Sequence, residues 1–462
     1  MLHSFQDLYQ AQQRFFHSGA TRPFEFRLTQ LRKLEKVLRA YEPQIEQALY
    51  ADLHKHPQEV FTTEVGGIYE EIRLILRDLK NWMQPKRVNH PLYLFPGSSW
   101  IYPEPLGIVL IITPWNYPFL LTFRAVVGAM AAGNTIVIKP SEISSHSAAL
   151  IEQMIRENFP AEYLTVLSGD GAGVVMPLLE QFHFDHIHFT GSPVVGAKIM
   201  EKAAKHLSPV SLELGGKSPC IIADDAHLEV VAKRIVWGKM VCTGQTCVAP
   251  DYLLVQESVK EKLVPVLIRE IERAYGSDAQ KSESYGRIIN RKRLDTLCAY
   301  LSEGRILYGG KFDAEDLYLS PTLLDQVSLE ARLMKEEIFG PILPIFTYRT
   351  PEEAVAFIER NPYPLSLYVF SAEKRIQQYF IQKIRFGGGA INETVLHLGN
   401  SELPFGGISY SGHGSYLGKY SFDAFTNFKS ILKRATWLEP GLRHPPFSIH
   451  KTKWWRRVLG RP

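Results

Sequence analysis

The segment between residues 105 and 210 alternates between apolar runs of strand length and runs with helical character. An order of strand, helix, strand, helix predicts a doubly wound parallel sheet. In such folds ligands bind at the carboxyl ends of the strands, so the turns after these strands are candidate binding positions. The expected strands are residues 107–112, 135–138, 164–167 and 186–189, and the expected helices are residues 118–132, 144–158, 173–181 and 193–205.

A second alternating series begins near Pro209 and predicts a second α/β domain. Two domains suit a chain of 462 residues, which is too long for one ordinary core. Ahead of both series, residues 6–50 and 63–83 have helical periodicity and are expected to be scaffold. The second series comprises the expected strands 210–213, 221–223, 252–256, 344–348 and 390–392, and the expected helices 227–241, 257–275 and 288–302.

Residues 84–103 interrupt the helical pattern with aromatic runs at 92–95 and 100–102 around a turn signal at 96–99. This pattern predicts a β-hairpin. Because an exposed aromatic hairpin promotes aggregation, we expect it to pack on another subunit. The tail from Pro440 is rich in Pro, His and Trp and is expected to be irregular.

Composition limits the classes of function. The apolar fraction of 45% and the charged fraction of 22% are those of a soluble globular protein. The net charge of +4, from 52 basic and 48 acidic residues, predicts no broad basic surface for nucleic acid. We find neither a signal-peptide pattern at the N-terminus nor an apolar run of the roughly 18–20 residues that cross a bilayer.

Cysteine usage favours a reducing, cytoplasmic compartment, because only four cysteines occur and none forms a CxxC pair. The spacing of Cys242 and Cys247 could suit a metal or redox pair, but no second pair accompanies it, so no metal site is expected.

Cys247 is the candidate nucleophile. It lies in the short polar loop 244–250, between an expected helix and an expected strand. A thiol attacks carbon as its thiolate, and free backbone N–H groups in a polar loop would favour that form over a packed core. The alternative, a small buried hydrophobic residue, is the commoner role for a lone cysteine.

Two further stretches are typical of nucleotide binding. The turn at Gly191 and Ser192 joins a strand to a helix, whose N-terminus suits a phosphate, although an ordinary turn has the same pattern. Lys139 and Glu142 follow another strand and could bind the hydroxyls of an adenosine ribose. Glu142 would disfavour a ribose 2′-phosphate by charge repulsion. The alternative for both residues is a pair of solvated loop charges.

Two polar side chains in apolar surroundings are candidates for catalysis. Glu213 ends an apolar strand and is followed by two glycines, so burial would raise its pKa and make it a usable base. Asn116 lies in a turn between a strand and a helix, where its amide can donate to a developing oxyanion. A turn-pairing glutamate and a common turn asparagine are the alternatives.

Seven motifs in order resemble one family, the NAD(P)-dependent aldehyde dehydrogenases, and within it the class 3 branch that acts on fatty and aromatic aldehydes. The motifs are PLGIVLIITPWNYPF from Pro105, AAGNTIVIKPSE from Ala131, FTGSPVVG from Phe189, LELGGKSP from Leu212, GQTCVAPDYLLV from Gly244, EEIFGPILP from Glu336 and LPFGGISYSGHGSYLGKYSF from Leu403.

The resemblance implies a role for each matching residue. Cys247 corresponds to the nucleophile, Glu213 to the general base and Asn116 to the oxyanion donor. The implied cofactor is NAD, with NADP as the alternative, and no metal is implied. The implied cofactor contacts are Thr113, Pro114, Trp115, Lys139, Ser141, Glu142, Gly191, Ser192, Leu214, Gly215, Glu337 and Phe339.

The resemblance also implies a Rossmann-like cofactor domain (1–84 and 104–210), a catalytic domain (211–418), and a bridging β element (85–103 and 419–438) through which a homodimer forms. Residues 439–462 are the C-terminal tail. Its paired tryptophans and cations suit peripheral contact with an anionic membrane, but the tail could equally pack on the partner subunit or be disordered.

Two alternative functions stay open at this point. In a CoA-acylating dehydrogenase, thiolysis replaces hydrolysis and a glutamate base is dispensable, so Glu213 favours hydrolysis. A non-catalytic binding or structural protein on the same scaffold would have no need of Cys247, Glu213 and Asn116 together.

Overall fold

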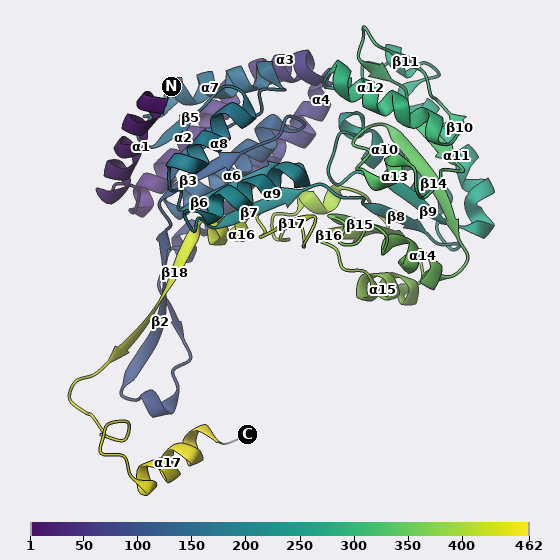
Figure 1. Ribbon diagram of the computed structural model, residues 1–462. Helices are drawn as coiled ribbons and strands as arrows, with labels where there is room; N and C mark the ends of the chain where they lie inside the picture. The colour runs from purple at the N-terminus through teal and green to yellow at the C-terminus, as the bar shows by residue number, and fades with distance from the viewer. Residues whose placement is uncertain (1, 461–462) are drawn as a thin grey trace.

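The computed structural model describes residues 2–460 and shows two lobes with an arm that projects below them (Figure 1). One lobe contains a six-stranded sheet, the other a seven-stranded sheet, and the arm a three-stranded sheet. A two-stranded ribbon, β11 (Phe312–Asp313) and β12 (Tyr318–Leu319), adds to the second lobe. The predicted α/β class is therefore confirmed.

The sheet of the first lobe has the order β17, β7, β6, β3, β4, β5, and only the edge strand β17 is antiparallel to its neighbour. Connections lead outward from β3 in both directions, as in a doubly wound sheet. The strands are β3 (Ile108–Ile112), β4 (Thr135–Lys139), β5 (Leu164–Val166), β6 (His186–Gly191), β7 (Val210–Leu214) and β17 (Gly412–His413), and their helices are α6 (Pro118–Ala132), α7 (Ser145–Asn158), α8 (Gly171–Gln181) and α9 (Pro193–Ala204).

The sequence places residues 210–213 in the second series, but β7 pairs with β6 in the first sheet. Both series consist of similar apolar runs, so the pattern does not show which sheet a strand joins. The domain boundary near residue 210 stays a prediction.

The sheet of the second lobe has the order β10, β13, β14, β9, β8, β15, β16, with only β10 antiparallel to its neighbour. The strands are β8 (Pro219–Ile222), β9 (Tyr252–Gln256), β10 (Arg305–Tyr308), β13 (Thr322–Asp325), β14 (Ile342–Tyr348), β15 (Ser366–Phe370) and β16 (Gly388–Ile391), and the helices are α10 (Leu228–Met240), α11 (Lys260–Tyr275), α12 (Arg291–Tyr300), α13 (Arg332–Lys335), α14 (Pro351–Ile358) and α15 (Lys374–Lys383).

The N-terminal segment is helical, as predicted, and packs on the first lobe, where its apolar side chains join those of α6 in one core. Helix α6 is buried almost all round, which fits its largely apolar sequence. The helices are α1 (Leu2–His17), α2 (Phe24–Ala40), α3 (Glu42–Leu53), α4 (Pro57–Val60), the π-helical turn η1 (Phe61–Val65) and α5 (Gly66–Trp82).

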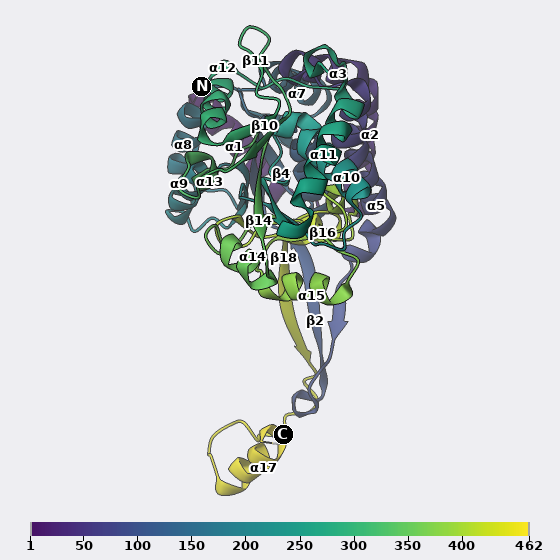
Figure 2. The same cartoon turned by 90° about the vertical axis from the view of Figure 1, so that its right-hand side faces the viewer.

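The arm consists of β1 (Lys86–Val88), β2 (Gly97–Pro105) and β18 (Thr426–Arg434), with β2 in the middle (Figure 2). The predicted strand at 92–95 is wrong, because residues 92–94 form a short 3-10 turn, η2 (Leu92–Leu94), between Pro91 and Pro96. The short helix α16 (Lys419–Ala424) leads into β18 and packs against α6.

The tail contains a helix, α17 (Ile449–Leu459), so the expectation of an irregular tail is also wrong. The Ser448 side chain accepts a hydrogen bond from the Lys451 N–H and starts this helix. Preceding prolines suggest irregular chain but do not prevent a helix that begins after them.

Candidate active site

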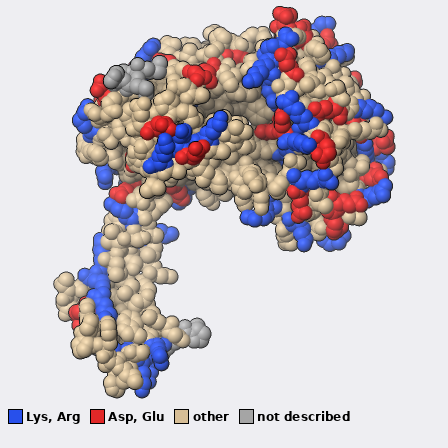
Figure 3. Space-filling model, in the orientation of Figure 1, with Lys and Arg blue, Asp and Glu red and all other residues tan. Residues whose placement is uncertain are grey.

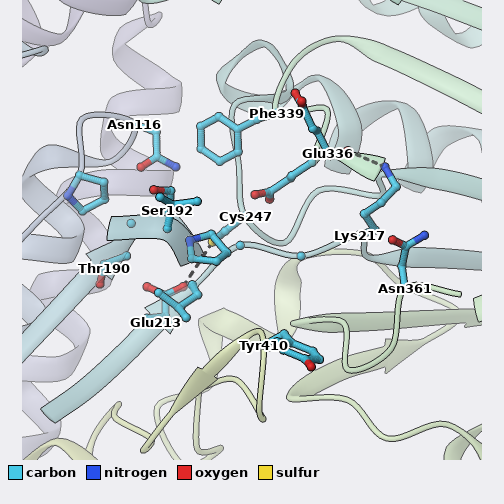
Figure 4. A pocket seen from close by; sticks show the side chains of 18 of the residues that line it. Asn116, Thr190, Ser192, Glu213, Lys217, Cys247, Glu336, Phe339, Asn361 and Tyr410 are labelled. Atoms are coloured by element: carbon cyan, nitrogen blue, oxygen red, sulfur yellow. Dashed lines mark hydrogen bonds between the residues drawn. The ribbon is translucent and has the colours of Figure 1, made fainter. Parts of the chain in front are cut away.

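A cavity of about 710 Å³ lies between the two lobes (Figures 3 and 4). Its walls come from the turns after β3, β6 and β7 in the first lobe and from loops of the second lobe. The carboxyl ends of parallel strands meet here, where doubly wound sheets bind ligands. All three predicted catalytic residues, Asn116, Glu213 and Cys247, line this cavity.

Cys247 lies in a turn between α10 and β9, and its approach is conformationally restricted. Cys242 and Thr243 both have φ of 52°, and Gly244 has φ of 74°. A Cβ on Gly244 would collide with the carbonyl oxygen of Gly340, so this position requires glycine. The turn directs the Cys247 thiol at Glu213, with 3.4 Å between Sγ and the Oε1 atom.

The sequence suggested a loop that favours the thiolate form of Cys247, but the surroundings of Cys247 in the structure favour the protonated thiol. Burial, followed by the nearby carboxylates of Glu213 and Glu337, raises the pKa of Cys247 well above its ordinary value. The sequence could not show this, because neither carboxylate lies near Cys247 in the chain. Cys247 therefore needs a base, and the group its thiol contacts is Glu213.

Glu213 occupies the second-last position of β7, where Gly412 of β17 pairs beside it. Its side chain is buried, and burial raises its pKa to about 7, against opposing hydrogen bonds that include those from Cys247 and Tyr416. The Tyr416 hydroxyl donates to the Oε2 atom over 3.4 Å. A carboxylate with this pKa can take up and release a proton near neutral pH.

Asn116 lies in the loop between β3 and α6 and is buried. Its Nδ2 atom donates to the backbone oxygen of Gln245 over 2.9 Å, which fixes the amide against the loop that contains Cys247. An amide nitrogen carries two hydrogens, so one remains for a group in the cavity. A fixed donor of this kind suits a developing oxyanion.

Most predicted cofactor residues lie together around the same cavity (Figure 4). The rings of Trp115 and Phe339 meet edge to face at 5.3 Å. Ser192 precedes α9, and its hydroxyl accepts from the Val195 N–H over 3.4 Å. The predicted residues on the cavity wall are Pro114, Trp115, Gly191, Ser192, Leu214, Gly215, Glu337 and Phe339.

Four predicted cofactor residues lie outside this wall. Lys139 ends β4, beside β3, and its Nζ atom donates to the Pro140 carbonyl over 2.7 Å and to Glu142 over 3.1 Å. Ser141 lies between them in the same turn. The Thr113 hydroxyl bonds to the Thr122 hydroxyl over 2.7 Å, which directs it into the protein rather than the cavity.

Several wall residues were absent from the sequence predictions. Lys217 and Tyr410 lie inside motifs that pointed to the site, whereas Arg293, Lys335 and Asn361 lie outside every motif and carried no signal. Thr190, inside the motif FTGSPVVG, also lines the wall, and Leu121, Arg360 and Tyr363 line it from outside every motif. Lys217 holds loops in place, because its Nζ atom donates to the carbonyls of Leu333 (2.8 Å) and Glu336 (2.9 Å) and pairs with Asp251.

Known proteins resemble this chain in sequence over most of its length. The model of a family described as "Aldehyde dehydrogenase family" matches residues 4–431. A 4,4′-diaponeurosporen-aldehyde dehydrogenase of Staphylococcus aureus is 47% identical over 435 residues, which cover 94% of each chain. A dog protein named "Aldehyde dehydrogenase, dimeric NADP-preferring" is 41% identical over 440 residues, covering 95% of this chain and 97% of its own.

The fold also matches a solved structure, the substrate-bound state of Staphylococcus aureus AldH. The TM-score is 0.96 at 45% sequence identity, and the match covers 98% of this chain and 99% of that one.

Proposed function

The chain belongs to the aldehyde dehydrogenase family and oxidises aldehydes to carboxylic acids with NAD(P), and we propose that Cys247, Glu213 and Asn116 carry out this reaction. The observation that supports these roles most strongly is the contact of 3.4 Å between Cys247 Sγ and Glu213 Oε1. This contact brings the thiol together with a carboxylate that can accept its proton, in a cavity that Asn116 also lines.

In the first half of the reaction, ionised Glu213 accepts the thiol proton and the Cys247 sulfur adds to the aldehyde carbon. The carbonyl oxygen becomes an alkoxide, and the free N–H of the Asn116 amide stabilises it. Loss of hydride from the same carbon leaves a thioester on Cys247. Glu213, once it has released its proton, takes another from water, which hydrolyses the thioester and restores the thiol.

The cavity fits a nicotinamide dinucleotide. The Gly191–Ser192 turn at the start of α9 offers backbone N–H groups to a pyrophosphate. Glu337 lies against Gly215, where a Cβ would collide with its carboxylate, so this glycine leaves room for Glu337 beside the thiol. When bound, the cofactor supplies the hydride acceptor. Trp115, Glu337 and Phe339 would hold its nicotinamide end, and Lys139 and Glu142 its adenosine ribose.

Replacing Cys247 by Ala should abolish NADH formation while leaving NAD binding intact. In Glu213→Gln the first turnover should slow and the steady-state rate should fall further, because both proton transfers lose their base. Dehydrogenase activity retained by Cys247→Ala would refute the assignment. Acyl-CoA formation in the presence of CoA would instead support the acylating alternative, and the absence of any aldehyde oxidation would support a non-catalytic role.

For the cofactor, we propose a preference for NAD set by Glu142. Lys139 holds this carboxylate at 3.1 Å, and hydrogen bonds keep its pKa below its ordinary value despite partial burial, so it is ionised at neutral pH. A ribose 2′-phosphate would meet a negative charge there. Glu142→Gln should raise kcat/KM for NADP relative to NAD. An unchanged ratio would contradict this role, and the NADP preference in the name of the dog relative makes the comparison informative.

For the substrate, we propose medium- or long-chain aliphatic or aromatic aldehydes. The apolar and aromatic side chains of Leu121, Tyr363 and Tyr410 also line the cavity, and the Staphylococcus relative is named for a carotenoid aldehyde. NADH appearance across an aldehyde series of increasing chain length tests this. Rates that rise with chain length support it, and rates that peak at the shortest aldehydes contradict it.

We also propose that the chain forms a homodimer through the arm. Phe428, Ile431 and Leu432 on the edge strand β18 are exposed, and an edge strand with exposed apolar side chains is a ready site for pairing with another chain. The name of the dog relative describes that protein as dimeric. Light scattering of the full chain should give twice the chain mass. Replacing Ile431 and Leu432 together by Ser should give the monomer mass, and an unchanged mass would contradict the proposal.

Finally, we propose a cytoplasmic protein whose tail contacts anionic membrane surfaces. Helix α17 carries Lys451, Lys453, Arg456 and Arg457 beside two tryptophans, and Figure 3 shows basic residues gathered at the tip of the arm. In residues 2–460 no helix has the length and apolar character to span a bilayer, so contact would be peripheral. Truncation after Gly441 should abolish co-sedimentation with anionic vesicles. Equal binding by the full-length and the truncated protein would show that the tail is not the membrane contact.

A further inference from the structure

A buried charged cluster beside the active site has no part in the chemistry described above. It lies between α3 and α5 and contains Lys55, Glu59 and Glu64. The side chains of Lys55 and Glu64 are only 1% and 0% exposed and form an ion pair of 2.6 Å. A buried ion pair is weak evidence for stabilisation, because desolvation offsets much of its attraction. The hydrogen bonds that Lys55 and Glu64 make to other residues indicate a different role for the pair.

Lys55 and Glu64 hold the two ends of the turn that carries Asn116. The Nζ atom of Lys55 donates to the Asn116 carbonyl over 2.8 Å and lies 4.0 Å from the centre of the Tyr117 ring. The second carboxylate oxygen of Glu64 accepts from the Leu120 N–H at the start of α6 over 2.9 Å. The pair therefore fixes the backbone on both sides of this turn.

The same cluster reaches the loop of the nucleophile. The N–H of Cys242 donates to Glu59 over 2.9 Å, and the Cys242 thiol donates to the Asn116 carbonyl over 3.4 Å. Cys242 has the positive φ of 52°, a conformation that needs support from its surroundings. The Asn116 carbonyl oxygen thus accepts hydrogen bonds from Lys55 and from Cys242. The side-chain amide of Asn116 donates to Gln245 in the same loop as Cys242.

From these contacts we propose that Lys55 and Glu64 are positioning residues that aim the Asn116 amide at the substrate oxygen. Lys55 fixes the backbone of Asn116 and Gln245 fixes its side chain. The second N–H of the side-chain amide is therefore held in a single orientation. The segment before α4, which contains Lys55, and the turn η1 thereby support catalysis from outside both sheets. A π-helical turn often marks such a site, and Glu64 lies in η1. This inference rests on the proposed role of Asn116.

The test uses Lys55→Met and Glu64→Gln in the full-length enzyme. We expect the rate of the first hydride transfer, followed as the burst of NADH in stopped flow, to fall about tenfold or more, since small misplacement of a catalytic group costs up to about a hundredfold. KM for NAD should not change. Two variants are used so that a folding failure in one leaves the other to decide.

The matched control is Lys260→Met. Lys260 also forms a part-buried pair of 2.6 Å, with Asp325, but neither residue lines the cavity. Its burst rate should equal that of the wild type. A loss in this control equal to that in Lys55→Met would show that the loss reflects general destabilisation and would overturn the proposal.

A double-mutant cycle separates positioning from other effects. In an Asn116→Ala background, Lys55→Met should change the burst rate less than about twofold, because the group it positions is gone. If Lys55→Met lowered the burst rate by the same factor with and without Asn116, the positioning role would be refuted and the oxyanion role of Asn116 would stand. An unchanged burst in Asn116→Ala itself would instead refute the proposed oxyanion role.

Discussion

The Glu213 carboxyl group is buried and has a pKa of about 7, so near neutral pH it exists in both protonation states. Only the ionised form can accept a proton from Cys247 or from water. The turnover rate at saturating substrate should therefore rise with pH through about 7 and level off above it. A pH series of steady-state rates measures this, and the residual activity of Glu213→Gln should lack the step. A step that persists in the variant would contradict the assignment.

The same burial has a cost in stability. Because the folded pKa lies above the unfolded value of about 4.3, ionisation opposes folding, and stability falls as pH rises from about 4.3 to about 7. Glu213→Gln removes that charge, so at pH 8 the variant should be more stable by up to about 3 kcal/mol. At about pH 4.5, where Glu213 is protonated in the folded protein, the two proteins should unfold alike. Thermal unfolding at both pH values tests this sign, and equal stabilisation at both would contradict it.

Sequence motifs predicted Cys247, Glu213 and Asn116 as catalytic residues, and the structure brings all three to one cavity. They could not give the protonation state of Cys247, because the carboxylates that raise its pKa come from residues 213 and 337. Tyr416, which contacts Glu213, is 203 positions away in the chain. Such contacts exist only after the sheets have formed, so no local pattern predicts them.

At the scale of elements, the turn that presents Cys247 depends on Gly244. Gly244→Ala should both strain the positive φ and push against Gly340, so activity should fall along with stability. Gly276 is the matched control, because it has a similar φ of 78° but no atom within 4 Å of the position that an added Cβ would occupy. Gly276→Ala should lose about 1–3 kcal/mol of stability and keep full activity. Equal activity in both variants would contradict the argument.

The elements that sequence predicted well are those with a continuous pattern. Strand β3 is a run of five apolar residues and β4 has three apolar residues between Thr135 and Lys139, and both lie within one residue of the expected bounds. The 3-10 turn at 92–94 has the aromatic composition of a strand, but prolines on both sides set its backbone. Helix α17 was missed because its start depends on one capping serine after a proline-rich stretch.

At the scale of the whole molecule, the candidate active site belongs to neither lobe alone. Asn116 and Glu213 come from the first lobe and Cys247 from the second. Because inter-domain contacts yield more readily than cores, urea should inactivate the enzyme at lower concentration than it unfolds either sheet. Activity and far-UV circular dichroism measured across one urea series test this, with saturating NAD expected to shift the activity midpoint upward. Coincident midpoints without NAD would contradict the prediction.

The path of the chain beyond β17 has a consequence for an assembled enzyme. Residues 412–434 lead from the ladder beside Glu213, through α16, directly into β18 of the arm. If the arm pairs subunits as proposed, docking against a partner restrains the segment that pairs beside Glu213, the proposed general base, in each protomer. In such a dimer the backbone of residues 412–434 would be the physical link between the subunit contact and the neighbourhood of Glu213.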